Sequence, residues 1–432
     1  MKNNKIKPSI LPGFMELLPR DQQAFNDIVR KITKVYEESG FLPMDTPIIE
    51  KSEVLLAKSA GETEKQVYRF NKGSNDLSLR FDLTVPVARF VAQYFNELTF
   101  PFKRYQIGKV YRGERNQRGR YRELYQCDID VIGNEKLSIN NDALVISMAS
   151  KAFKAIGLEN YKFQISNRKI LAAILKELEI IETTEVMTLI DKYDKIGETS
   201  FAEQLIETVG AEKSSVINKV INMQGNGDEM IAKLEELRIN SQELKTGIEE
   251  LKQVLSMLTI LGVGEDEYVV NLKIIRGLDY YTGTVFETFL LGNEVYGSIC
   301  SGGRYDSLAQ NYTDKVLPGV GISIGLTRLF FVLKEIGFID KYVVESSVEY
   351  LIIPIGDTLE FCGELYKKLL SSGKGVEIYL EDNDKLKKKL SYANKLGIPK
   401  VIIVGEDEVA TGVIKVKDMI NGDDYILNAD KI

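Results

Sequence analysis

The order of apolar and polar side chains predicts a helix near the start of the chain. Between residues 21 and 39, apolar side chains stand at positions 25, 28, 29, 32 and 35, the spacing of a helix with one buried face. Gly40 ends this pattern. The following segment, FLPMDTPIIE, predicts an extended chain, because each of its prolines disfavours helical geometry in the residue before it.

Strand-like alternation follows in three later segments. Residues 77–82 and 124–132 alternate like half-buried strands. Residues 285–300 predict a hairpin that turns at Gly292-Asn293. Strands joined by hairpins favour an antiparallel sheet.

Two further regions differ from this sheet pattern. From about residue 166 to residue 262, long helical patterns rich in Glu, Lys, Leu and Ile predict a helical insertion within the sheet domain. After a charged stretch near residues 340–348, apolar strand patterns alternate with helical ones. This alternation predicts a separate C-terminal domain with a parallel, three-layered α/β arrangement.

The composition is that of an ordinary soluble protein. Of 432 residues, 44% are hydrophobic and 28% are charged, and the net charge is −7. This length allows two or three domains with cores of their own. Prolines and Glu16 interrupt the N-terminal segment, so it does not resemble a signal peptide, and no later segment resembles a membrane span. We therefore expect a cytoplasmic protein without a membrane partner.

Cysteine and histidine usage excludes several kinds of chemistry. The cysteines at positions 127, 300 and 362 lie far apart and form no CxxC, so neither a disulfide framework nor a zinc site is indicated. The chain contains no histidine. An imidazole general base, a Ser-His or Cys-His nucleophile and a metal site with imidazole ligands are therefore excluded.

Basic side chains are concentrated in one stretch of this acidic chain. Between Lys103 and Arg122 there are eight basic side chains and one acidic side chain, Glu114. The stretch is either a basic hairpin tip or a loop that contacts phosphate, to which arginine offers two parallel hydrogen bonds. In the strand that follows, Gln126 and Asp130 lie four residues apart and point to the same face. That face is either exposed to solvent or part of a site.

Several segments resemble a known enzyme class. YRGERNQRGRYRELYQCDIDVIG resembles motif 2 of the class II aminoacyl-tRNA synthetases, GVGISIGLTRL is similar to motif 3, and TPIIE is similar to motif 1. RGLDYYTGTVFE, followed by SGGRYD, resembles the two signature segments of the histidyl-tRNA synthetases. The resemblance runs from about residue 8 to the C-terminus, and the two signature segments make it sharper than a class assignment.

The resemblance implies a fold and a domain order. The fold class would be α+β, in which residues 1–165 and 263–335 form the class II catalytic core, an antiparallel sheet flanked by helices. Residues 166–262 would form the helical insertion, and residues 347–432 would form an α/β anticodon-binding domain. Enzymes with this motif 1 pattern are usually homodimers, so a symmetric homodimer is expected.

The implied activity is that of a ligase, a histidine–tRNA ligase. L-Histidine and ATP would react to histidyl-adenylate and pyrophosphate, and histidine would then be transferred to the 3′ end of histidine tRNA. The attacking carboxylate is already ionised, so catalysis by positioning and charge stabilisation suffices in a chain without histidine. Mg²⁺ would bind mainly through the nucleotide phosphates, without a metal site made by the protein alone.

The resemblance also implies roles for individual residues. The implied catalytic residues are Arg276 and Arg112, on opposite sides of the α-phosphate. Asp130 and Tyr281 would contact the imidazole, and Asp82, Thr84 and Gln126 would hold the amino group. Tyr280 would complete the histidine pocket.

Further residues would contact ATP and tRNA. ATP would be bound by Arg112, by Glu114 at the adenine edge and by Arg328 at the γ-phosphate. Arg115 and Gln117 would approach the acceptor end of the tRNA. In the C-terminal domain, KLKKKLSYANKLG holds a run of lysines that is either a solvated helix face or a surface attracting an RNA backbone: Lys385, Lys387, Lys388 and Lys389.

Two alternative interpretations remain beside the synthetase. One is a histidine-binding regulatory paralogue without aminoacylation activity, and the other is a synthetase-like RNA-binding or sensor protein with a silent site. The paralogue normally lacks the C-terminal domain and the ATP-binding arginines. Because Arg112, Arg276, Arg328 and residues 348–432 are all present, we favour the synthetase.

Overall fold

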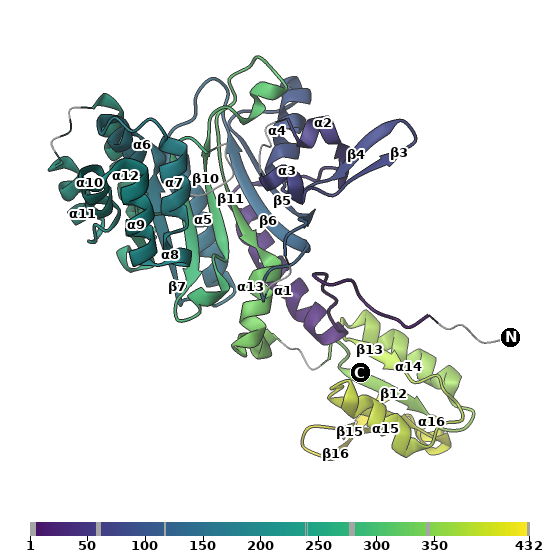
Figure 1. Cartoon of the computed structure of the whole chain (residues 1–432). Helices are drawn as coiled ribbons and strands as arrows, with labels where there is room; N and C mark the ends of the chain where they lie inside the picture. The colour runs from purple at the N-terminus through teal and green to yellow at the C-terminus, as the bar shows by residue number, and fades with distance from the viewer. Residues whose placement is uncertain are drawn as a thin grey trace. The chain divides into compact units, whose positions relative to one another are not determined.

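The computed structural model describes most of the chain, namely residues 6–57, 62–115, 118–237, 239, 241–275, 281–342 and 346–429. The chain divides into two compact units, one of Met1–Leu17 and Phe25–Ile339 and one of Leu18–Ala24 and Asp340–Ile432 (Figure 1). Gln117, Arg276 and Tyr280, which the sequence predicted in the site, lie outside the described residues. No helix in the described part is long and apolar enough to cross a membrane.

The centre of the larger unit is a sheet. Within the described residues, eight strands pair in the order β1-β5-β6-β11-β10-β9-β7-β8. The pairs β1-β5 and β7-β8 are parallel, and the other neighbours are antiparallel. This arrangement confirms the predicted α+β fold. The strands are β1 (Leu42–Pro43), β5 (Phe102–Tyr111), β6 (Glu123–Ile132), β7 (Tyr161–Asn167), β8 (Tyr268–Val270), β9 (Thr284–Leu290), β10 (Cys300–Tyr305) and β11 (Gly319–Gly325).

The two faces of this sheet differ in polarity. On one face, Cys127, Ile129 and Val131 of β6 are fully buried. The helices α1 (Pro19–Glu38), α5 (Asn140–Ala155) and α13 (Leu326–Glu335) pack on this apolar face. Because strand residues alternate between faces, the opposite face of β6 carries its polar side chains, Gln126, Asp128 and Asp130.

A smaller sheet lies beside the polar face of the large one. It has the order β2-β4-β3, with β2 (Ile49–Lys51), β3 (Arg69–Lys72) and β4 (Asn75–Leu79), next to the short helices α2 (Ser52–Leu55) and α3 (Glu62–Gln66). In this sheet, β4 begins and ends earlier than the strand that the sequence predicted at residues 77–82. It ends before Asp82 because that carboxylate accepts a hydrogen bond of 3.0 Å from the Val85 N–H, at the start of α4 (Thr84–Gln93).

The link between β9 and β10 is longer than the sequence predicted. The two strands are antiparallel neighbours, as expected for a hairpin. The chain turns at Gly292, where the Asn293 N–H donates to the Leu290 carbonyl at 3.0 Å, but the connection is not confined to Gly292-Asn293, because a 3₁₀ helix at Glu294–Tyr296 continues the loop. Gly292 adopts a φ of 76°, and its N–H donates a 2.9 Å hydrogen bond to the Glu294 carboxylate, which fixes this longer connection.

The region between β7 and β8 is helical, as predicted. Figure 1 shows its helices gathered beside β7, where α12 packs against α5, α6 and β7. Ser241 caps the start of α12, and Asn226 and Glu229 form a capping box at the start of α11. The helices are α6 (Arg168–Glu177), α7 (Thr183–Asp191), α8 (Tyr193–Ile196), α9 (Glu198–Val209), α10 (Ala211–Ile221), α11 (Gly227–Glu235) and α12 (Gln242–Ile260).

The smaller unit is an α/β domain with a sheet of order β13-β12-β14-β15-β16. The first three strands are parallel, as predicted, and β15 and β16 add an antiparallel edge. Ile352 packs with Cys362 on one face of the sheet, and Leu351 packs with Ala393 on the other, which gives three layers. The elements are β12 (Tyr350–Pro354), α14 (Leu359–Ser371), β13 (Val376–Ile378), α15 (Leu386–Lys395), β14 (Lys400–Val404), α16 (Glu406–Thr411), β15 (Val413–Asp418) and β16 (Asp424–Asn428).

One lysine of the basic run on α15 does not face solvent. Lys389 is 3% exposed, and its ammonium donates to the Pro354 carbonyl at 3.2 Å and lies 5.4 Å from the centre of the Tyr379 ring. The exposed Lys388 forms an ion pair with Asp384 at 2.7 Å. A solvated run of four lysines is therefore wrong, because the helix turns Lys389 toward the core.

A buried ion pair joins the sheet to α5. Asp142 is fully buried, and its carboxylate accepts hydrogen bonds of 3.1 Å and 2.7 Å from Arg304 of β10. Arg304 also donates to the carbonyl groups of Leu137 and Ser138. These bonds fix the end of the strand that carries SGGRYD.

We predict that Asp142→Asn destabilises the protein by about 3 kcal/mol, because it leaves the buried Arg304 guanidinium without its main counter-charge. The midpoint of thermal unfolding should fall by roughly 5 °C. Asp27→Asn is the matched control, since Asp27 forms a pair with the exposed Arg30. It should shift the midpoint by less than about 1 °C, and equal shifts in both variants would contradict the prediction.

Candidate active site

Polar side chains from three neighbouring strands meet on the polar face of the large sheet. Asp130 of β6 lies opposite Arg104 of β5, and Asp128 lies opposite Ser323 of β11. A Cβ atom at Gly321 would stand 2.0 Å from Asp130 Oδ1, so only glycine lets this carboxylate lie over β11. The register of the strands therefore builds one continuous polar surface.

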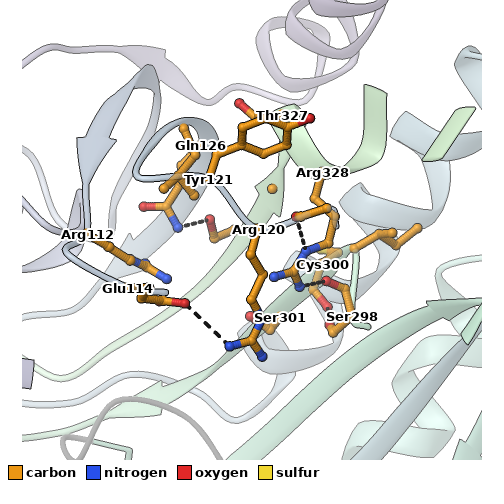
Figure 2. Close-up of a pocket in the computed structure, with 15 residues that line it drawn as sticks. Arg112, Glu114, Arg120, Tyr121, Gln126, Ser298, Cys300, Ser301, Thr327 and Arg328 are labelled. Carbon is orange, nitrogen blue, oxygen red and sulfur yellow. Dashed lines mark hydrogen bonds and ion pairs between the residues drawn. The ribbon is translucent and has the colours of Figure 1, made fainter. Parts of the chain in front are cut away.

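A cavity opens beside this surface, next to the loop that joins β5 to β6. Figure 2 shows that the guanidinium groups of Arg112 and Arg328 face the same space, with Glu114 and Gln126 nearby. The lining combines this loop with β10, β11 and the start of α13, and its polar residues include Arg112, Glu114, Arg120, Gln126, Ser301, Ser323 and Arg328.

Arg328 is held firmly against the wall of this cavity. It donates to the carbonyl groups of Ser298 at 2.6 Å and Gly119 at 3.2 Å. Burial, followed by the nearby charges of Arg120 and Arg112, lowers the pKa of Arg328. The three cations therefore repel one another, and an anion bound between them would relieve that repulsion.

The other charged groups of the cavity wall are also anchored. Arg112 donates from Nε to the Phe81 carbonyl at 3.0 Å, which aims its guanidinium from the loop into the cavity. Glu114 forms an ion pair of 3.4 Å with Arg120. This side of the site carries net positive charge, and its arginines have the forked geometry that binds phosphate.

Asp82 lies just before α4 and directly after Phe81, whose carbonyl accepts the hydrogen bond from Arg112. It is 2% exposed, and its Oδ2 atom has no hydrogen-bond partner among the described residues. Burial raises its pKa from 3.8 to about 6, against the lowering effects of the Val85 N–H, Arg112 and Arg104. A cationic ligand group placed beside this carboxylate would stabilise its ionised form.

Two more buried carboxylates share the charge of Arg104, which is fully buried. Arg104 forms an ion pair with Asp130, and the Tyr305 hydroxyl donates to Asp130 Oδ1 at 2.7 Å. Burial raises the pKa of Asp130 and brings that of Asp128 to about 7. Arg104 lowers both pKa values, whereas Asp130 and Asp82 raise that of Asp128. This side of the site is therefore suited to a cation.

The predicted residues fall into three groups. Arg112, Glu114, Gln126 and Arg328 line the cavity, and Asp82 and Asp130 are buried in the polar face. Thr84 is the first residue of α4, the ring of Tyr281 lies against Gly303, and Arg115 is exposed on the loop rather than in the cavity wall. Arg276, Tyr280 and Gln117 belong to the residues that the structure does not describe.

Sequence reasoning missed several residues of this site, namely Arg104, Arg120, Asp128, Tyr305 and Ser323. Asp128 could have been identified from the sequence, because it stands between Gln126 and Asp130 at the two-residue spacing of one strand face. Arg120 belonged to the basic stretch, but nothing in its spacing separated it from neighbouring arginines. Arg104 and Ser323 join the site only through the pairing of β6 with β5 and β11.

Comparisons with known proteins point to one family. The family model described as histidyl-tRNA synthetase matches residues 13–329, and the one described as anticodon binding domain matches residues 349–432. A histidine–tRNA ligase of Clostridium acetobutylicum is 64% identical over 430 residues, covering 100% of both chains. The crystal structure of a histidyl-tRNA synthetase from a Nostoc species has a TM-score of 0.89 at 35% identity, covering 99% of this chain and 98% of that one.

A more distant structure shares the fold alone. It is described as an ATP phosphoribosyltransferase regulatory subunit/histidyl-tRNA synthetase from Bacillus halodurans, with a TM-score of 0.77 at 21% identity. It covers 92% of this chain, and this chain covers 99% of it.

The raised pKa values predict a pH dependence of stability. Because the folded chain holds protons on Asp82 and Asp128 up to about pH 6 and 7, whereas both carboxyls ordinarily ionise near 3.8, unfolding releases protons in this window. Their contribution to the free energy of unfolding therefore decreases as the pH rises from about 4 to about 7. Asp128→Asn should remove part of this decrease, on the order of 3 kcal/mol.

The measurement is the midpoint of thermal unfolding of the ligand-free protein at pH 5, 6, 7 and 8. Asp128→Asn should lose less stability between pH 5 and pH 8 than the wild type loses, whereas Asp27→Asn, at a half-buried surface position, should follow the wild type. Parallel curves for all three proteins would contradict the assignment to Asp128.

Proposed function

Since this chain belongs to the histidyl-tRNA synthetase family, we propose that the cavity and its buried carboxylates join histidine to ATP. The family match and the 64% identity to a histidine–tRNA ligase over the full chain identify the function as ligation of histidine to tRNA. The observation that carries the residue assignments is the separation of charge within the site. Three arginines line the cavity, and three buried carboxylates lie on the polar face beside it.

Histidine is proposed to bind at the acidic side of the site. Its α-ammonium is held by Asp82, Thr84 and Gln126, which is supported by the buried Asp82 and Gln126 oxygens that have no partner among the described residues. Its imidazole lies between Asp130 and Tyr281, and Tyr280 closes the pocket. Arg104 favours the ionised form of the Asp130 carboxylate against the effect of burial, and in that form Asp130 accepts a hydrogen bond from a ring N–H.

ATP is proposed to bind at the basic side. Arg112 holds the α-phosphate and the histidine carboxylate, Glu114 meets the adenine edge, and Arg328 holds the γ-phosphate. The carboxylate attacks the α-phosphorus in line, a P–O bond forms, and the bond to pyrophosphate breaks with its electron pair leaving on pyrophosphate. Arg112 and Arg276 stabilise the negative charge on the phosphoryl oxygens from opposite sides.

Mg²⁺ is proposed to be held mainly through the nucleotide phosphates. Among the described residues, no group of three His, Cys, Asp or Glu side chains is arranged to hold a metal ion. When bound to the phosphates, Mg²⁺ supplies further neutralisation of their charge. The arginines orient the same phosphates from the protein side.

The tRNA is proposed to contact both units of the chain. Arg115 is exposed on the loop beside the cavity, and it would approach the acceptor end together with Gln117. Its exposure supports a contact with RNA rather than with ATP. The C-terminal unit matches the anticodon-binding family, so we assign the anticodon to it. The exposed Lys385, Lys387 and Lys388 add a salt-sensitive attraction to the RNA backbone.

A homodimer is proposed as the assembly. Apolar side chains stay exposed along the motif 1 segment, including Leu42 at 58%, Ile48 at 41% and Ile49 at 48%. Beside them the buried Arg80 reaches the exposed Asp45 at 3.1 Å. An apolar strip anchored in this way supports a symmetric interface between two copies of the chain.

The regulatory paralogue is a weaker candidate. The 21% identical structure described as a regulatory subunit/histidyl-tRNA synthetase shows only that the fold is shared. The arginines of the cavity and the match of residues 349–432 to an anticodon binding domain favour an enzyme that charges tRNA. ATP–pyrophosphate exchange that requires histidine distinguishes the two.

We predict that Arg112→Ala and Arg276→Ala each lower the rate of histidine-dependent ATP–pyrophosphate exchange by about 10²–10³-fold. Each substitution removes a charged donor that stabilises the transition state, and such losses have this size. The exchange rate should be measured at saturating histidine and ATP.

Arg118→Ala is the matched control. Arg118 lies on the same loop, but its guanidinium pairs with Glu335 and lies 5.4 Å from the centre of the Tyr296 ring. Its exchange rate should stay within about twofold of the wild type. Near-normal exchange in folded Arg276→Ala protein would remove Arg276 from the proposed mechanism.

We predict that Asp130→Asn raises the KM for histidine, and raises it more at pH 6 than at pH 8. Without Asp130 the buried Arg104 charge is less compensated, and it repels an imidazole that is protonated below its pKa of about 6.5. The KM should be measured across this range by pyrophosphate exchange.

Tyr305→Phe is the control for Asp130, because it removes one hydrogen bond to the carboxylate and leaves the charge in place. It should keep the pH profile of the wild type. An unchanged profile in Asp130→Asn between pH 6 and pH 8 would show that Asp130 does not interact with the ring.

A further inference from the structure

A chain of hydrogen bonds connects Gln126 to Asp128 through Ser323. Gln126 Nε2 donates to Ser323 Oγ at 3.0 Å, and the Ser323 hydroxyl donates to the Asp128 carboxylate, which lowers the pKa of Asp128. Ser323 lies directly opposite Asp128 in the pairing of β11 with β6, so the strand register sets this contact. None of the roles assigned above uses Asp128 or Ser323.

The chemistry of these groups fixes the direction of the chain. A hydroxyl has one proton to donate, and above its pKa of about 7 the Asp128 carboxylate is ionised and can only accept. The Ser323 proton is therefore committed to Asp128, and Ser323 can only accept a hydrogen bond from Gln126. The amide nitrogen of Gln126 must then face Ser323, and its carbonyl oxygen must face the other way.

The free end of this amide is an acceptor in the site. Gln126 lines the cavity, and its Oε1 atom is buried without a hydrogen-bond partner among the described residues. A carbonyl oxygen in this position attracts an ammonium group. If the amide were flipped, its NH₂ group would face the ammonium, and two donors would meet.

We propose that Asp128 and Ser323 are positioning residues that hold the Gln126 side-chain carbonyl toward the α-ammonium of histidine. This inference rests on the proposed contact of Gln126 with the amino group, and it adds the residues that select the orientation of its amide. The two orientations of a side-chain amide, which differ by the exchange of its oxygen and its nitrogen, have nearly the same shape. Packing alone therefore distinguishes the two orientations poorly. Ser323 distinguishes the two orientations, because its hydroxyl donates its proton to Asp128 and can then only accept from the Gln126 NH₂ group.

The experiment compares the wild type with Asp128→Asn and Ser323→Ala in pyrophosphate exchange at pH 8, above the pKa of Asp128. An asparagine can donate to Ser323, and an alanine removes the middle of the chain, so both variants release the amide. The KM for histidine should rise about tenfold in each, the effect of weakening one hydrogen bond to a charged group, while the KM for ATP stays unchanged. Ser323→Thr keeps the hydroxyl and should retain most of the wild-type KM.

Two competitive inhibitors separate this role from a general loss of structure. Histidinol keeps the ring and the ammonium, whereas 3-(imidazol-4-yl)propionate keeps the ring and lacks the ammonium. In Asp128→Asn and Ser323→Ala the inhibition constant of histidinol should rise about tenfold, and that of the propionate should stay within about twofold. Equal losses for both inhibitors would overturn the proposal in favour of a structural role.

A double-mutant cycle with Gln126→Ala tests whether Asp128 acts through the amide. In the Gln126→Ala background, Asp128→Asn should have no further effect on the KM for histidine. A second tenfold rise of this KM would show direct contact between Asp128 and the ammonium, and would overturn the proposal that Asp128 acts through Gln126. A wild-type KM for histidine in Asp128→Asn would also overturn it. Failure of the proposed function is a separate outcome, because the wild type itself would then show no histidine-dependent exchange.

Discussion

The site depends on one guanidinium, that of Arg104, buried among carboxylates on the polar face of the sheet. An isolated ion is costly to bury, and a buried carboxylate without a positive partner becomes protonated. Arg104 lowers the pKa of Asp82, Asp128 and Asp130, all of which burial raises. With one cation near three carboxylates, the cluster keeps a negative character that a ligand cation can complete. The β5-β6 register, which sets Arg104 opposite Asp130, is therefore the feature from which the chemistry of the site follows.

The polarity of the site matches the polarity of the reaction. A free amino acid brings an ammonium beside a carboxylate, and ATP brings a chain of anions. In the proposed site the buried carboxylates would attract the ammonium and the arginines of the cavity would attract the phosphates, which would bring the carboxylate and the α-phosphorus together. Positioning of this kind converts charge complementarity into catalysis without a protein base, which suits a chain that contains no histidine.

The sequence predicted the elements of the fold better than it predicted their partners. The local periodicity of apolar residues predicted α1, the strand β6, the helical insertion and the α/β character of the C-terminal unit. Each of these depends mainly on residues that are close together in the sequence. The periodicity failed where the contact of one side chain, rather than the apolar pattern, decides the local structure: Asp82 accepts from the Val85 N–H at the start of α4, Glu294 accepts from the Gly292 N–H in the β9-β10 loop, and Lys389 turns toward the core of the small unit. The site divides in the same way. Gln126 and Asp130 followed from alternation along one strand, whereas Arg104 and Ser323 depend on registers across long loops, which no local pattern contains.

In the proposed site, preference for an amino acid follows from buried polar atoms that have no partner in the protein. Oxygen atoms of Asp82 and Gln126 are buried without hydrogen-bond partners among the described residues, and each such group costs roughly 1–3 kcal/mol in the folded protein. A ligand that supplies their missing donors recovers this free energy, and a ligand of the same shape without an ammonium leaves the cost in place. A hydrophobic pocket discriminates weakly between similar shapes, whereas a pocket with buried, unpaired acceptors discriminates by orders of magnitude. The same atoms that reduce the stability of the folded chain therefore give the site its preference for an amino acid.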